Sequence, residues 1–143
     1  MVDLQSILHS HRSKGNHKET QHEGGDEVFR AKPTLAEIPD LFFDQVIVDY
    51  KLSRIEILVL MYIYRRVWCY PNLHRDHGIS PMMSHTEMGR VLHLAIEDVY
   101  SALRKLEEHE FIKTIRAGQY FVRRYFTKAL DDELGQSYSD FDI

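Results

Sequence analysis

A helical pattern that is apolar on nearly every side, from Lys51 to about Tyr70, constrains the fold more than any other part of the sequence. Ser53 followed by Glu56 is typical of a capping box, in which two residues bond each other's backbone N–H groups at a helix start. The apolar residues that follow surround the predicted helix: Ile55, Leu58, Val59, Tyr62, Ile63 and Val67. Because other elements must cover such a helix, we expect it at the centre of one modest core.

Shorter patterns flank this central helix. Pro39 begins a short helical pattern over residues 39–47, with proline in the first turn. Pro71 ends the central helix, and the polar residues 71–78 predict a loop. A very short strand at residues 79–80 is expected to follow the loop.

Two further helices are predicted after this loop. Ser84 and Glu87 have the spacing of a second capping box, so we expect a helix that runs through Leu92. A turn at His93 and Leu94 leads to a third helix, expected from 95 to about 110. Its inward side carries apolar residues at steps of three and four: Ile96, Val99, Leu103 and Leu106.

The last pattern is a hairpin. Residues 112–116 and 119–126 are rich in β-branched and aromatic side chains, and Ala117 and Gly118 separate them as a tight turn would. The predicted fold class is therefore mainly α with a small β-hairpin. We expect a disordered, polar, His-rich tail at 1–27, a domain with an added N-terminal helix at 28–130, and an acidic C-terminal tail at 131–143.

Charge separates the body of the chain from its ends. The net charge is −4, yet residues 51–128 hold thirteen Lys and Arg against eight Asp and Glu. Residues 1–50 carry five bases and nine acids, and residues 131–143 carry five acids and no base. A basic body between acidic ends indicates a nucleic-acid partner.

Other classes of protein are not indicated. The longest apolar run, residues 57–63, is far shorter than the roughly 20 residues of a membrane span, and the N-terminus lacks a secretory signal pattern. We therefore expect a cytoplasmic protein with no membrane contact. No catalytic motif occurs, so we expect no enzyme activity and no cofactor. Cys69, His74, His77 and His85 have spacings that zinc could use but match no known finger, so we expect a buried thiol and no metal.

The run from Thr86 to Ile115 has the order of apolar and small positions found in the winged helix-turn-helix family, which it resembles. Glu87, Met88 and Gly89 stand where the family's second helix begins, with the small residue where two helices approach. The other matching positions are Leu92 and Leu94 around the turn, Val99, Ala102, Leu103, Leu106 and Glu107 in the third helix, and Phe111 and Ile112 before the wing.

Upstream residues have a weaker resemblance to the N-terminal DNA-binding domain of phage replication protein O and related replisome organisers. The parallels are Ile38-Pro39, then Leu52-Ser53 with Glu56, then Arg65-Arg66-Val67-Trp68 before the loop.

These resemblances imply a three-helix core plus a β-wing that binds double-stranded DNA. The third helix is expected in the major groove and the wing on phosphates or in the minor groove. The candidate DNA-binding residues are Tyr100, Ser101, Arg104 and Lys105 on the third helix, and Lys113, Arg116, Arg123 and Arg124 on the hairpin. A homodimer is expected, because one recognition helix rarely buries enough surface for specificity. Transcription control and replication initiation both stay open.

Glu97 and Asp98 depart from the family pattern at the start of the third helix. They suit the helix dipole but not a phosphate-lined groove, although Glu97 can accept a hydrogen bond from cytosine N4. The alternative function is therefore a winged-helix adaptor, whose acidic third helix and tails bind a protein partner.

Overall fold

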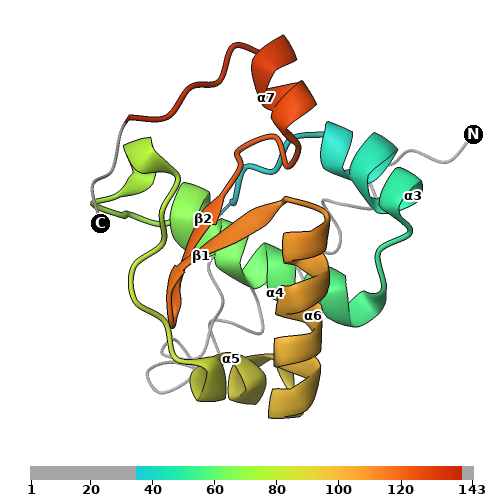
Figure 1. The fold of residues 1–143 in the computed structure, drawn as a ribbon, viewed down its shortest axis with the longest axis vertical. Helices are drawn as coiled ribbons and strands as arrows, with labels where there is room; N and C mark the ends of the chain where they lie inside the picture. The colour runs from blue at the N-terminus through green and yellow to red at the C-terminus, as the bar shows by residue number, and fades with distance from the viewer. Residues whose placement is uncertain (1–34, 140–143) are drawn as a thin grey trace, which may run out of the picture. The chain divides into compact units, whose positions relative to one another are not determined.

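The computed structural model of the chain describes residues 35–139, which are mainly helical with one small antiparallel sheet (Figure 1). The α-helices are α3 (Ile47–Tyr50), α4 (Arg54–Tyr64), α5 (His85–Leu92), α6 (Ile96–Glu108) and α7 (Lys128–Glu133). The sheet consists of β1 (Ile112–Arg116) and β2 (Gln119–Val122). The predicted mainly α class with a small hairpin is confirmed, whereas the prediction for residues 1–27 lies outside the described residues. No helix within residues 35–139 has the length and apolar composition needed to cross a membrane.

The central helix begins and ends where the sequence predicts. The Glu56 N–H donates to Ser53 Oγ, and the Ser53 N–H donates to the Glu56 carboxylate, each over 3.2 Å. α4 continues through a π-helical turn, η2 (Arg65–Cys69), and the backbone becomes extended at Tyr70. A second π-helical turn, η1 (Phe42–Val46), precedes α3 and forms the short helix expected after Pro39.

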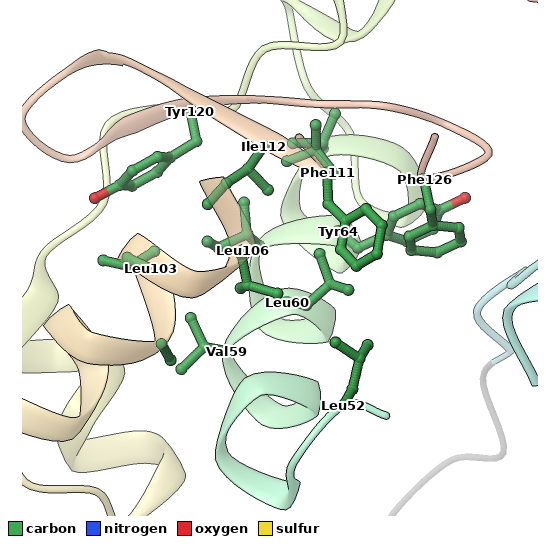
Figure 2. Packing of buried hydrophobic residues seen from close by; sticks show 14 of the residues in the cluster. Leu52, Val59, Leu60, Tyr64, Leu103, Leu106, Phe111, Ile112, Tyr120 and Phe126 are labelled. Atoms are coloured by element: carbon green, nitrogen blue, oxygen red, sulfur yellow. The ribbon is translucent and has the colours of Figure 1, made fainter. Parts of the chain in front are cut away.

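Side chains of α4 form the middle of the core, between the hairpin and α6 (Figure 2). The Tyr64 ring stacks on the Phe126 ring with centroids 4.8 Å apart. α6 turns most of its predicted apolar stripe inward, since Val99, Leu103 and Leu106 are buried. Each such side chain contributes roughly 1.5–3 kcal/mol when it is removed from water.

One side of α4 is less covered than the sequence predicts. Ile57, Leu58, Met61 and Tyr62 are only partly buried. With Val91 and Leu92 of α5 they line a surface groove of about 430 Å³. The prediction of a helix covered on all sides is wrong here, because the eight-residue α5 reaches over only part of this side.

The hairpin turn is attached to the preceding loop. Gly118 has a φ of +84°, and a Cβ atom at this position would lie 2.5 Å from the Met83 carbonyl oxygen. Only glycine fits such a turn without strain. Ile79 pairs with Phe121 of β2 as an isolated bridge, which confirms the very short strand expected after the loop.

The second strand is shorter than predicted. β2 ends at Val122, whereas the sequence places the strand end at Phe126. The Phe126 N–H donates to the Arg123 carbonyl over 3.2 Å, and Phe126 has a φ of 72°, so the backbone turns and carries the ring into the core. The Tyr125 N–H bonds the Asp131 carboxylate over 3.0 Å instead of β1.

The folded domain continues beyond residue 130, where the sequence analysis ends it. Thr127 caps α7 by accepting the Leu130 N–H over 3.1 Å. Asp131 on this helix is only 1% exposed. Its carboxylate accepts the Tyr138 hydroxyl over 2.6 Å, so residues assigned to an acidic tail pack on the domain through a buried polar network.

Candidate nucleic-acid interface

α5 begins with half of the predicted capping box. Ser84 Oγ accepts the Glu87 N–H over 3.1 Å. The Glu87 carboxylate, however, accepts Arg90 Nε over 2.9 Å rather than returning to the Ser84 backbone. A charged donor one turn away competes well with a backbone N–H, because hydrogen bonds between ions are stronger.

Gly89 allows close contact between α5 and the turn before α6. A Cβ atom here would lie 2.9 Å from the Leu94 carbonyl oxygen and 3.8 Å from a Val99 methyl group. The Leu94 N–H donates to the Gly89 carbonyl over 2.8 Å, while His93 reverses the chain with a φ of 56°. The need for a small residue at the helix approach is confirmed.

Four candidate DNA-binding residues lie on the exposed side of α6: Tyr100, Ser101, Arg104 and Lys105. Arg104 donates to Ser101 Oγ over a long 3.4 Å. Lys105 pairs with Glu108 over 3.4 Å, and both side chains are at least half exposed. Such exposed pairs contribute about 0–1 kcal/mol, so a ligand can displace them readily.

The first turn of the same helix is acidic. Glu97 and Asp98 are exposed, and neither carboxylate makes a hydrogen bond or ion pair within residues 35–139. The exposed side of α6 therefore carries negative charge at its start and positive charge around Arg104 and Lys105.

Lys113 of β1 belongs to a second basic group. It lies in a cleft of about 590 Å³, which we call the Lys113 cleft, formed with Glu107, Glu110, Ile112, Thr114, Phe121, Arg123 and Lys128. The Glu107 carboxylate is occupied by the Thr114 N–H, which donates over 3.1 Å. The two lysines, Lys113 and Lys128, are exposed.

Sequence reasoning missed Lys128 as a partner of Lys113. The signal was available in Thr127, a good N-cap residue followed by three strong helix formers, Lys128, Ala129 and Leu130. The strand pattern that runs to residue 126 in the sequence conceals this helix start, because it leaves too few residues for a helix within the predicted domain.

Arg116 does not join this group. It lies beside the hairpin turn, where its Nε donates to Gln119 Oε1 over 2.8 Å. Its neighbours across a shallow groove are residues 71–74 and Pro81. The structure therefore places it apart from the Lys113 cleft.

Arg123 and Arg124 follow the second strand and do not project from it, contrary to the predicted strand. Arg123 bonds the Asp131 carboxylate over 3.3 Å, and its side chain is 24% exposed. The Arg124 guanidinium lies over the Trp68 ring, 5.4 Å from its centroid. Both are held by core contacts, because the chain turns inward after Val122.

Tyr100 is positioned by a contact that the sequence did not reveal. Its ring meets the edge of the His85 ring at 5.2 Å, and His85 Nε2 shares a hydrogen bond with the Tyr120 hydroxyl. Burial raises the pKa of Tyr120 to about 12, so this hydroxyl stays protonated at neutral pH. The three rings connect α5, α6 and β2.

The residues with zinc-compatible spacing lie in different surroundings. Cys69 Sγ contacts the Glu37 carbonyl, and burial raises the pKa of its thiol. His77 Nδ1 bonds the Ser139 carbonyl, whereas His85 bonds Tyr120. Within residues 35–139 no three His, Cys, Asp or Glu side chains gather as a metal site would require.

Comparison of the chain with protein-family models, with curated proteins and with solved structures gave no match.

Proposed function

We propose that residues 84–126 act as a winged helix-turn-helix that binds double-stranded DNA, with α4 completing the three-helix core. The observation that carries the proposal is the order α5, tight turn, α6, hairpin, with exposed cations on both α6 and β1. In this class of fold the third helix enters the major groove and the wing follows the backbone.

The positions of the exposed cations indicate which residues contact phosphates and which contact bases. Lys113 and Lys128 are suited to phosphates, because both are exposed cations in one cleft. Ser101 and Arg104, in the middle of the exposed side of α6, are suited to base edges. The acidic first turn of α6 moves the expected groove contact toward the second and third turns.

Titration of fluorescent duplexes drawn from genomic fragments tests this proposal. Binding is expected at low salt, and Ser101→Ala or Arg104→Ala is expected to change the preference between sequences. Asp49→Ala, a change at an exposed residue of α3, is the control. Absence of binding at low salt would contradict the proposal.

We further propose that two copies bind together, in transcription control or replication initiation. One recognition helix offers too little surface for useful specificity, so a pair of half-sites is expected. Sedimentation of the protein with a bound duplex measures the stoichiometry. One copy on every specific duplex would contradict the homodimer.

A second candidate function is a winged-helix adaptor. The observation that favours it is the pair of exposed carboxylates, Glu97 and Asp98, which have no partner within residues 35–139. A basic protein surface would pair with them. The test is capture of a stoichiometric partner by the wild type but not by Glu97→Lys with Asp98→Lys, while duplex binding stays negligible in both.

A further inference from the structure

A polar cleft lies on the far side of the hairpin from α6. It consists of two adjoining hollows of about 510 and 480 Å³ that share Trp68, Arg75 and Arg124 as walls. Residues 36–40 line one hollow and residues 136–139 line the other. In Figure 1 the 3-10 turn η3 (Arg75–His77) and the C-terminal segment lie to the left of the hairpin, whereas α6 lies to its right. We call this the Arg75–Arg124 cleft.

Arg124 is fixed in this cleft without the use of its side-chain donors. Its guanidinium lies over the rings of Trp68 and Tyr125, at 5.4 and 6.0 Å from their centroids. Its backbone N–H donates to the Tyr138 hydroxyl and its carbonyl accepts the Tyr64 hydroxyl, each over 2.8 Å. Because these ring contacts use none of its N–H groups, the guanidinium donors stay available to an acceptor.

Arg75 adds a second cation with open donors. Within residues 35–139, neither Arg75 nor Arg124 directs its guanidinium to a carboxylate or another hydrogen-bond acceptor. The contrast is with Arg90, Arg116 and Arg123, which each donate to a side-chain oxygen.

The remaining walls supply further polar groups. Around Arg75 and Arg124, the C-terminal hollow is lined by Asp76, Gln136, Ser137, Tyr138 and Ser139. The hydroxyls of Ser137 and Ser139 supplement the donors of the two guanidinium groups, whereas the Gln136 amide already donates to the Ser137 carbonyl over 2.8 Å. Asp76 is the one carboxylate among the described walls of this hollow, and Glu37 and Asp40 line the neighbouring hollow.

We propose that the Arg75–Arg124 cleft binds a phosphate group. Several acceptor oxygens around one doubly charged centre match two guanidinium forks and nearby hydroxyls better than a single carboxylate would. The Trp68 and Tyr125 rings hold the Arg124 guanidinium in place beside the cleft, so less side-chain freedom is lost when it binds an anion. The site is independent of the proposed DNA contacts on α6 and the Lys113 cleft.

The chain contains a built-in reporter for this site. Trp68 is its only tryptophan, and the Arg124 guanidinium covers it. Titration with sodium phosphate is expected to change Trp68 emission saturably, whereas sodium chloride at equal ionic strength is not. Calorimetry of the same titration gives a readout that does not depend on the tryptophan.

Variants of the two arginines test the geometry. Arg75→Gln and Arg124→Gln are each expected to weaken phosphate binding by about tenfold or more, the effect of losing one charge-assisted bond of about 1.4 kcal/mol. Arg54→Gln, an exposed arginine at the start of α4, is the matched control and is expected to bind phosphate as the wild type does. Equal affinity in the wild type and a folded double variant would overturn the proposal.

Asp76→Asn keeps the proposal testable where an arginine variant fails to fold. Removal of the carboxylate from the wall is expected to tighten phosphate binding, because like charges repel. Unchanged affinity in this variant would contradict the site.

Competition distinguishes the sources of the phosphate. A short single-stranded oligonucleotide that displaces inorganic phosphate from the wild type, and loses affinity in Arg124→Gln, would assign the cleft to a nucleic-acid backbone. Displacement by a mononucleotide but not by the oligonucleotide would assign it to a small phosphate compound. Duplex binding that survives Arg75→Gln shows that the proposed DNA interface is separate.

Discussion

At the scale of single residues, Asp131 connects three parts of the chain. Its carboxylate accepts the Tyr125 N–H after β2, a guanidinium N–H of Arg123, and the hydroxyl of Tyr138. A buried carboxylate is tolerated only when such donors replace water. One acidic residue thus fixes the end of the hairpin, α7 and the C-terminal segment together.

Replacing Asp131 should therefore lower the stability of the fold much more than its position in an acidic stretch of the sequence indicates. Asp131→Ala is expected to lower the free energy of unfolding by about 3 kcal/mol, because it leaves Arg123 without its buried partner. Urea unfolding measures the change. The control is Asp132→Ala, an exposed neighbour expected within about 0.5 kcal/mol of wild type. Equal losses for the two variants would contradict this role.

Tyr120 makes the free energy of unfolding depend on pH in the alkaline range. Its pKa is raised by burial from 10.0 to about 12, so the folded state holds the phenolic proton more tightly than the unfolded state does. The stabilisation is complete below about pH 10 and is lost as the pH rises toward about 12. Burial also raises the pKa of Tyr64 and of Tyr138, which adds to the same loss.

Tyr120→Phe is expected to make the fall of unfolding free energy above about pH 10 less steep. One group contributes at most about 1.4 kcal/mol per pH unit. Urea unfolding at a series of alkaline pH values measures the slope, with Tyr70→Phe at an exposed tyrosine as the control. An unchanged slope for Tyr120→Phe would be inconsistent with its raised pKa.

At the scale of elements, local patterns predicted most of what the structure contains. Ser53 with Glu56, the stripe on α6 and the glycine of the hairpin turn each depend on neighbours a few residues away, so their spacing was sufficient. The predicted end of β2 was wrong because residues 123–126 have the composition of a strand. In the structure the Tyr125 N–H bonds the Asp131 carboxylate, so these residues do not pair with β1. Such contacts across the fold leave no periodic signal in the sequence.

The turn between α5 and α6 depends on Gly89. Gly89→Ala would place a Cβ atom 2.9 Å from the Leu94 carbonyl oxygen, which is backbone and cannot move aside cheaply. We expect a loss of about 1–3 kcal/mol in the free energy of unfolding, measured by urea unfolding. Asp98→Ala at an exposed position of α6 is the control, and a Gly89→Ala variant as stable as this control would show that the helices can separate freely.

At the scale of the whole molecule, the candidate site was only partly predictable. The residues on the exposed side of α6 follow from helical periodicity, and Lys113 follows from strand alternation. Arg123 and Arg124 could not be placed in this way, because a guanidinium in sequence carries no sign of whether a buried carboxylate or an aromatic ring will hold it. The cations therefore divide between two sides of the hairpin.

That division predicts how salt affects duplex binding. Lys113→Gln combined with Lys128→Gln is expected to reduce the slope of log affinity against log salt by about 2, because each lysine that no longer neutralises a phosphate lowers the slope by about one unit. Arg54→Gln on α4 should leave the slope unchanged. Fluorescence anisotropy at several salt concentrations measures the slopes for the wild type and both variants. Equal slopes in all three proteins would show that the Lys113 cleft does not contact the duplex.

The bonds of Tyr138 also set an order for completing the domain during its synthesis. The segments that form α4, α5, α6 and the hairpin leave the ribosome first, yet the Arg124 amide and the Asp131 carboxylate lack their hydroxyl partner until Tyr138 emerges. A nascent chain paused before that residue would expose the Trp68 side of the core, against which the Tyr138 ring packs at 6.2 Å. Release of residue 138 from the exit tunnel is thus the step at which chaperone access to this side of the core should end.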